Sequence, residues 1–284
     1  MGAPKSFLKV VGSGNDFILF DARKQPVTNP TAARWARRWC DRHRGVGADG
    51  LLLVLPSRKG LAKMRIFNAD GSAAEMCGNG LRCVAWYLHT TNRGARNFRV
   101  ETDAGLMGAQ ITGNEKIRIH FPEPSRLRLR QKLTVRNTEL VVHSVNTGVP
   151  HAIVLVPNLN RSNLMAVAPG IRFHRAFGAR GTNVDFVQVL SPKRIAIRTY
   201  ERGVEGETLA CGTGAVASAA IATALKRTQP PVQVKTASGE TLTVGLERRG
   251  GGSGPRAFHR NGHGTFQVWL EGPARILFKG ELKG

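Results

Sequence analysis

The sequence has 284 residues, of which 41% are hydrophobic and 21% charged, which suits a globular protein of about two domains. It contains no apolar run near the roughly 20 residues that cross a bilayer, and its first residues lack the features of a secretory signal. Its four cysteines are too few for a disulfide scaffold. Membrane, disulfide-rich secreted, collagenous and disordered classes are excluded, and we expect a cytoplasmic protein with no membrane partner.

The charge is strongly unbalanced, with 42 Lys and Arg residues against 19 Asp and Glu and a net charge of +23. Such an excess attracts polyanions, so a basic nucleic-acid-binding protein is one alternative. The basic residues form only short clusters, such as 34–38 and 126–130, without zinc-finger spacing or an RNP-type run. We therefore do not expect nucleic acid as a partner. A solvated basic surface accounts for the charge, and it would also steer an anionic substrate.

Short β-branched and alternating apolar runs predict strands along most of the chain. In chain order they fall at 17–20, 51–54, 97–101, 117–121, 152–156, 184–189, 194–199, 265–270 and 276–282. The glycine-rich stretch 248–264, directly before the strand at 265–270, predicts a loop.

Two helices are predicted, each just after a cysteine. Apolar residues at helical spacing indicate the first, at positions 81, 84, 85 and 88. The second, 215–225, is apolar on all sides, which favours a helix enclosed by sheet. Lys226 and Arg227 suit its C-terminal end, and Pro230-Pro231 prevents its continuation.

The sequence repeats itself at an offset of 134 residues, the separation of Cys77-Gly-Asn-Gly from Cys211-Gly-Thr-Gly. Further pairs follow the same order and nearly the same offset: Gly14 with Gly148, Gly47 with Gly181, and Arg65-Ile-Phe-Asn68 with Arg198-Thr-Tyr-Glu201-Arg202. Ordered matches at one offset indicate two copies of one fold unit. The strands at 265–282 fall outside the pairing, and we expect them to complete the first unit.

The duplicated cysteines carry the predicted chemistry. A cysteine at a helix N-terminus faces unsatisfied N–H groups and the positive end of the helix dipole, which favours its thiolate. The amides of Gly78, Asn79, Gly212 and Thr213 could hold a carboxylate. One thiol on each side of a carbon acid would remove a proton from one face and deliver one to the other. Cys77 and Cys211 are thus candidate bases for stereoinversion.

The other two cysteines, Cys40 and Cys83, are expected to be inert core residues, as buried cysteines usually are. No cluster of His and Cys has the spacing to complete a metal site around Cys77 and Cys211, so no metal is expected.

Six motifs together resemble the diaminopimelate epimerase family. They are Asn15-Asp-Phe, Asp41-Arg-His-Arg-Gly-Val-Gly-Ala-Asp49-Gly, Arg65-Ile-Phe-Asn68-Ala-Asp-Gly-Ser72, Cys77-Gly-Asn-Gly, Tyr200-Glu-Arg-Gly203 and Glu207-Thr-Leu-Ala-Cys-Gly-Thr-Gly214, followed by Trp269-Leu-Glu-Gly-Pro-Ala-Arg275. The resemblance implies a cofactor-independent isomerase that interconverts LL- and meso-2,6-diaminopimelate in lysine and peptidoglycan precursor biosynthesis. It also implies a homodimer.

The implied fold is a mixed α/β (α+β) architecture of two pseudo-symmetric domains, each a mixed sheet wrapped around a central helix. We expect the N-terminal half to span residues 1–118, completed by strands within 265–284, and the C-terminal half to span 119–264.

The resemblance also implies roles for individual residues. Cys77 and Cys211 match the two catalytic bases, with Cys77 acting on the LL isomer, and His151 with Glu201 matches a pair that tunes the cysteines. The matched substrate-binding positions are Asn15, Asn68, Gly78, Asn79, Asn183, Glu201, Arg202, Gly212 and Thr213. An arginine can pair bidentately with a distal carboxylate, and asparagines can complete its hydrogen bonds.

At two positions the sequence departs from some family members: Gly50 stands in place of glutamine, and Val149 in place of asparagine. Both leave part of the substrate contact unassigned, so a racemase of another amino acid on the same scaffold is a second alternative.

Overall fold

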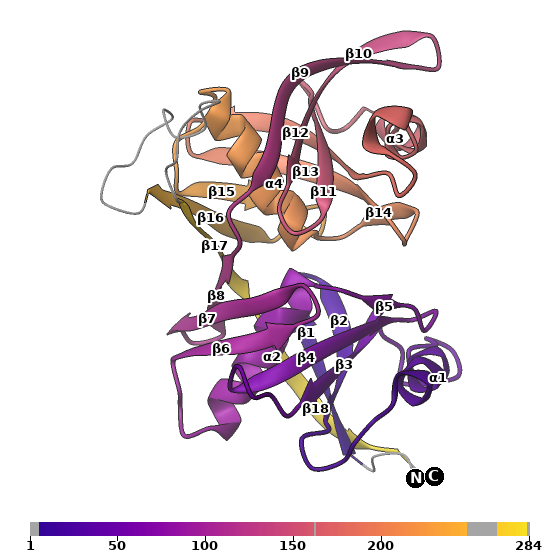
Figure 1. Cartoon of the computed structure of the whole chain (residues 1–284), viewed down its shortest axis with the longest axis vertical. Coiled ribbons are helices and arrows are strands. Elements are labelled where there is room, and N and C mark those ends of the chain that lie inside the picture. The colour runs from indigo at the N-terminus through magenta and orange to yellow at the C-terminus, as the bar shows by residue number, and fades with distance from the viewer. Residues whose placement is uncertain (1–5, 162, 249–265, 283–284) are drawn as a thin grey trace. The chain divides into compact units, whose positions relative to one another are not determined.

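The computed structural model describes residues 6–161, 163–248 and 266–282, which pack into two units. Unit 1 comprises residues 1–119 and 271–284, and unit 2 comprises 120–270. The chain passes from the first unit to the second within β8 and returns within β17. Each unit is a mixed sheet curled around one central helix, which confirms the expected fold class (Figure 1).

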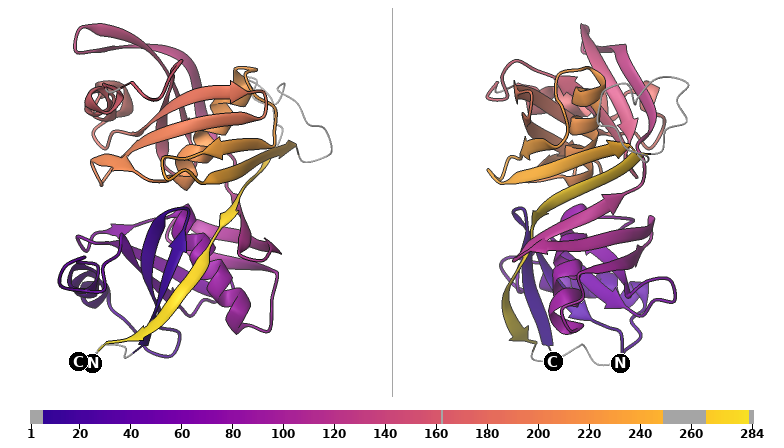
Figure 2. Two further views of the ribbon diagram at one scale, coloured as in Figure 1. Left: turned by 180° about the vertical axis from the view of Figure 1, so that it is seen from behind. Right: turned by 90° about the vertical axis from the view of Figure 1, so that its left-hand side faces the viewer.

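Unit 1 contains the first eight strands, two helices and the last strand. In chain order these are β1 (Ser6–Gly12), β2 (Asn15–Asp21), α1 (Asn29–Trp39), β3 (Gly50–Leu55), β4 (Ala62–Asn68), β5 (Ala73–Ala74), α2 (Gly78–Thr91), β6 (Asn97–Thr102), β7 (Gly105–Gly113), β8 (Lys116–Phe121) and β18 (Arg275–Glu281). The last strand pairs antiparallel with β1, so the two ends of the unit lie side by side (Figure 2).

Unit 2 contains the remaining elements. They are β9 (Ser125–Val135), β10 (Thr138–Asn146), β11 (Pro150–Leu155), α3 (Leu164–Arg172), the 3-10 turn η1 (Arg175–Phe177), β12 (Asn183–Ser191), β13 (Arg194–Glu201), β14 (Gly206–Thr208), α4 (Gly212–Ala224), β15 (Val232–Lys235), β16 (Thr241–Arg248) and β17 (Phe266–Pro273).

The strand pairing confirms the predicted duplication. In unit 1, β2 runs parallel to β3, β3 antiparallel to β4, and β4 parallel to β6. In unit 2, β11, β12, β13 and β15 repeat these relations in the same order. Gly14 and Gly148 both have positive φ, of 88° and 104°, in the turns that precede β2 and β11. These turns need glycine because other residues rarely adopt that conformation.

The central helix of unit 2 has the enclosed position that its sequence predicts. Every residue of α4 from Gly212 to Thr223 is buried, and the helix contacts β10 to β13, β15 and β16. It ends at Ala224, where Lys226 takes a left-handed φ of 59° and the amides of Lys226 and Arg227 bond back to Thr223 and Ala222. These are the two hydrogen bonds of a Schellman cap, so the helix ends before Pro230 is reached.

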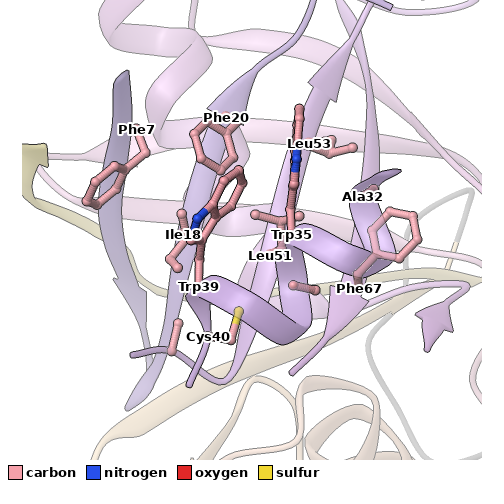
Figure 3. Packing of buried hydrophobic residues seen from close by; sticks show 12 residues of the cluster. Phe7, Ile18, Phe20, Ala32, Trp35, Trp39, Cys40, Leu51, Leu53 and Phe67 are labelled. Atoms are coloured by element: carbon pink, nitrogen blue, oxygen red, sulfur yellow. The ribbon is translucent and has the colours of Figure 1, made fainter. Parts of the chain in front are cut away.

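Two outer helices, α1 and α3, have no counterpart in the sequence prediction. Each lies between the equivalent strands of its unit, α1 after β2 and α3 after β11. The inner face of α1 carries Trp35 and Trp39 (Figure 3). The centroids of their rings lie 5.8 and 5.2 Å, respectively, from the ring centroid of Phe20. Cys40 is buried in the same cluster, as expected of an inert core cysteine, and burial raises the pKa of its thiol to about 12.

The basic cluster at 126–130 belongs to a strand hairpin that the sequence analysis did not predict. It lies in β9, which pairs antiparallel with β10 through the turn at Arg136 and Asn137. Both turn residues have positive φ, of 47° and 63°, which is typical of a two-residue type I′ hairpin turn.

Some expectations fall outside the described residues. These are nearly all of the loop expected at 248–264 and the first residue of the strand expected at 265–270. The strands described at 266–273 and 275–281 confirm the rest of that prediction. No helix within the described ranges has the length and apolar character needed to cross a membrane.

Close packing at Gly245 yields a stability prediction. A Cβ atom at Gly245 in β16 would overlap the indole ring of Trp269, whereas one at Gly206 in β14 meets nothing within 4 Å. We expect Gly245→Ala to lower the free energy of unfolding by about 1–3 kcal/mol, because the ring or the strand must shift. Gly206→Ala is the control, with a change of about 0.5 kcal/mol or less. Urea denaturation measures both, and equal effects would contradict the packing argument.

Candidate active site

Cys77 and Cys211 occupy the same local position in their units. Each is the N-cap of the central helix, and its Sγ accepts a hydrogen bond of 3.4 Å from the amide of the third residue on, Gly80 or Gly214. The helices therefore begin at Gly78 and Gly212, and the first amides of a helix have no intrahelical partner. Each half thus offers a sulfur beside anion-binding N–H groups.

In unit 1, a chain of hydrogen bonds fixes the amide side chains beside Cys77. Asn79 donates to Asn15 at 2.6 Å, and Asn15 donates to the carboxylate of Asp49 at 2.9 Å. The Asn79 oxygen in turn accepts from Arg82 at 2.7 Å. Asn15 and Asn79, predicted separately as ligand residues, therefore lie in contact, and their hydrogen bonds fix the orientation of both side-chain amides.

Arg82 belongs to the same hydrogen-bond network, and the sequence analysis did not single it out. Its side chain is fully buried, one helical turn beyond Cys77, and its guanidinium also donates to the hydroxyl of Ser13 at 2.6 Å and to the carbonyls of Gly78 and Pro273 at 3.3 Å. The guanidinium ties the first turn of α2 to the β1–β2 turn. An arginine within an apolar helical pattern was the available signal.

In unit 2, a second chain of contacts runs inward from Cys211. The Cys211 sulfur lies 3.3 Å from the hydroxyl of Thr213, which lies 2.9 Å from Nε2 of His151. Nδ1 of His151 lies 2.7 Å from the carboxylate of Asp185. His151 and Asp185 are both completely buried. The structure thus brings the predicted residues His151, Thr213 and Cys211 together and adds Asp185.

Asn183 and Arg202 meet at the ends of β12 and β13. The Asn183 side-chain oxygen accepts from the backbone amide of Arg202 at 2.8 Å, and its amide nitrogen donates to the carbonyl of Pro150 at 3.2 Å. Asn183 is one strand position before Val184 and two before Asp185, so Asn183 and Asp185 share a face of β12. A charged residue inside the apolar run 184–189 was the signal for Asp185.

The remaining predicted residue, Asn68, lies at the end of β4. It is directly opposite Gly50 in the β3–β4 pairing, and its side chain donates to the hydroxyl of Ser72 at 2.9 Å. A Cβ atom at Gly50 would lie 2.8 Å from the carbonyl oxygen of Phe67. That approach is too close for a side chain, which gives a physical reason for the glycine at this position. Val149 lies in the turn before β11, where its carbonyl accepts from the amide of Thr147.

Burial makes the Cys211 thiol a weaker acid than its helix position suggests. Burial, and then the negative charges of Glu201 and Asp185, raise the pKa of Cys211 well above that of an exposed cysteine, although Thr213 and the Gly214 amide favour the thiolate. The expected preference for thiolate is therefore wrong for Cys211. Desolvation and like charge outweigh the helix terminus. Burial likewise raises the pKa of Glu201.

Cys83, expected to be inert, is buried in α2, and its burial raises the pKa of the thiol. Among the described residues there is no group of three or more His, Cys, Asp or Glu side chains arranged to hold a metal ion.

The effect of Glu201 on Cys211 can be measured. Replacing Glu201 with Gln removes one of the negative charges that disfavour the thiolate, so we expect the pKa of Cys211 to fall. Iodoacetamide labelling of Cys211, followed by mass spectrometry across a pH series, should show its midpoint moving to lower pH in Glu201→Gln. The Cys77 peptide in the same digest is the internal control. A Cys211 midpoint that does not move would contradict the electrostatic coupling.

Comparison with known proteins finds a family model and relatives that match most of the chain. The family model described as diaminopimelate epimerase matches residues 7–126 and 143–250. A diaminopimelate epimerase of Chlorobaculum tepidum is 39% identical over 274 residues, covering 95% of this chain and 98% of the relative. One of Aquifex aeolicus is 42% identical over 249 residues, covering 84% and 88%.

Solved structures share the fold at low sequence identity. A phenazine biosynthesis protein of the PhzF family from Bacillus anthracis has a TM-score of 0.70 at 17% identity, with 99% of each chain covered. A hydroxyproline epimerase from Agrobacterium vitis has a TM-score of 0.71 at 18% identity, with 98% of this chain and 90% of that one covered. With the family match across both duplicated halves, the relatives at 39–42% identity show that this chain belongs to the diaminopimelate epimerase family of isomerases.

Proposed function

We propose that the protein interconverts LL- and meso-2,6-diaminopimelate without a cofactor, using Cys77 and Cys211 as its two bases. The observation that carries this proposal is that both cysteines are N-caps of equivalent central helices in a duplicated chain. A carbon acid inverts when one group removes its proton and another protonates the opposite face. A duplicated unit supplies one thiol for each face.

In the LL to meso direction, the thiolate of Cys77 takes the α-proton and the thiol of Cys211 delivers a proton to the other face. The burial that raises the pKa of Cys211 supports its role as the proton donor. The α-carboxylate binds the amides of Gly78, Asn79, Gly212 and Thr213. The same amides also stabilise the negative charge that develops at the reacting carbon and its carboxylate.

The far end of the substrate carries an ammonium group and a second carboxylate. We propose that Arg202 binds this carboxylate bidentately, with Asn68 and Asn183 completing its hydrogen bonds, and that Glu201 accepts from the ammonium group. The bond from the Arg202 amide to Asn183 supports placing these two residues in one subsite. Asn15, which is held by Asn79 and Asp49, contributes from unit 1.

The product would serve lysine and peptidoglycan precursor synthesis in the cytoplasm. The four cysteines are free thiols, which suits a reducing compartment. We also propose a homodimer. Leu277 and Phe278 on β18 support it, since these large apolar side chains are about half exposed, at 53% and 50%.

Serine substitution tests the roles of the cysteines. Cys77→Ser and Cys211→Ser should each lower kcat by about 10²-fold or more, because a hydroxyl is a far weaker acid than a thiol. Circular dichroism and thermal unfolding should remain close to wild type. Cys83→Ser is the matched control at a buried cysteine with no proposed proton-transfer role, and its kcat should be near the wild-type value. Turnover close to wild type in either helix-cap variant would reject the role given to that cysteine.

Proton exchange in deuterated water tests the substrate. We expect α-proton exchange and epimerisation with LL-diaminopimelate. L-lysine lacks the second carboxylate that we propose Arg202 binds, so we expect it to react about 10³-fold more slowly or worse. Exchange with proline or other monocarboxylic amino acids alone would favour a racemase of another amino acid. Salt-dependent binding of RNA, together with no exchange on any amino acid, would favour the nucleic-acid-binding alternative.

A further inference from the structure

The least expected polar group in unit 2 is the carboxylate of Asp185. It is completely buried on β12, between the apolar residues Val184 and Phe186. Burying an ionised carboxylate is costly unless hydrogen bonds compensate it. Its two oxygens are engaged separately: Oδ1 accepts from the hydroxyl of Thr199 at 2.7 Å, and Oδ2 lies 2.7 Å from Nδ1 of His151.

The position of this carboxylate is fixed from three sides. Thr199 lies directly opposite Asp185 in the β12–β13 pairing. His151 is held one strand away on β11, opposite Asn183. A Cβ atom at Gly214 would overlap Oδ1 of Asp185, so the last glycine of the Cys211-Gly-Thr-Gly motif leaves the space that the carboxylate occupies. The motif around the cysteine and the aspartate on the strand therefore fit each other.

A carboxylate at Nδ1 decides where His151 carries its proton. Because an ionised carboxylate only accepts, Nδ1 must be the donor, and Nε2 is left as the nitrogen that gains or loses a proton. Nε2 faces the Thr213 hydroxyl at 2.9 Å, which is 3.3 Å from the Cys211 sulfur. The three groups form a continuous path from the sulfur to the imidazole.

We propose that Asp185 is a positioning residue that fixes the Nδ1 proton of His151, so that Nε2 exchanges a proton with Cys211 through the hydroxyl of Thr213. In one direction the sulfur gives its proton to Oγ1 of Thr213, and the hydroxyl proton of Thr213 passes to Nε2. The result is a Cys211 thiolate and an imidazolium paired with the Asp185 carboxylate. The reverse transfer restores the thiol.

This inference rests on the proposed function, because it assigns to Cys211 a catalytic proton. It adds a means of changing the protonation state of that cysteine. A two-base epimerase needs Cys211 as a thiol in one direction and as a thiolate in the other. A single switching nitrogen connected to the sulfur gives a route between the two states inside a buried site.

Nitrogen-15 NMR of the wild-type protein tests the tautomer directly. With the imidazoles labelled, His151 is assigned by the signal that disappears in His151→Asn. We expect its proton on Nδ1. In Asp185→Asn, Thr199 continues to donate to the amide oxygen, so the amide NH₂ faces Nδ1 of His151. Because this NH₂ group is a donor, Nδ1 must accept, and the imidazole proton of His151 should move to Nε2. A wild-type His151 that carries its proton only on Nε2 would overturn the proposal.

Steady-state kinetics test the consequence. We expect Asp185→Asn to lower kcat at least tenfold while KM for diaminopimelate changes less than threefold; a wrong tautomer costs a serine protease about 10⁴-fold. Glu271→Gln is the matched control, since Glu271 is also a buried carboxylate, 7% exposed and 3.0 Å from both Lys116 and Arg118, but it belongs to unit 1, whereas Cys211 belongs to unit 2. Its kcat should be unchanged. An unchanged kcat in Asp185→Asn would overturn the proposal.

Two further measurements keep the outcomes separate. If Asp185→Asn does not fold, the wild-type NMR spectrum and two Thr213 variants test the proposal instead. Thr213→Ser keeps the hydroxyl and should have a kcat about tenfold above that of Thr213→Val. Equal kcat values in these two variants would overturn the relay. If Cys211→Ser turns over like wild type, the proposed function fails. The tautomer of His151 would still report whether Asp185 positions it.

Discussion

The position of a cysteine at the N-cap of an enclosed helix governs the rest of this structure. The strands of unit 2 bury α4 along its whole length from Gly212 to Thr223. Its first-turn amides therefore meet the sulfur and a prospective ligand with little competition from water, which strengthens their electrostatic effect. Small residues dominate the helix because strands surround it on all sides. In unit 1, α2 is buried from Gly78 to Ala85, and Cys77 caps it in the equivalent position.

The two units share a backbone plan but surround their cysteines with different charges. Beside Cys77, the buried guanidinium of Arg82 organises neutral amides and hydroxyls. Beside Cys211, the carboxylates are the completely buried Asp185 and the half-buried Glu201, with His151 between the helix and the strand, and their negative charges make the thiol harder to ionise. Duplication thus supplied the geometry, and divergence of the polar residues around it made the halves chemically unequal.

Glycines couple these polar groups to the strands that carry them. Gly214 leaves the space taken by the Asp185 carboxylate, and Gly50 allows β3 to approach the Phe67 carbonyl. In both places the missing side chain is explained by a close contact rather than by a turn. A side chain at Gly50 would therefore disturb the pairing of β3 with β4.

The sequence by itself determined the duplication, the two central helices, the glycine-flanked cysteines at their N-termini and the family, because these depend on local patterns: a 134-residue offset and helical spacing. It did not reveal α1 and α3, whose amphipathic faces are defined only by the sheet they cover. Nor did it reveal the protonation preference of Cys211 or the partnership of Asp185 with His151. Those depend on burial and on strand register, which join residues 34 positions apart, and only the tertiary structure decides them.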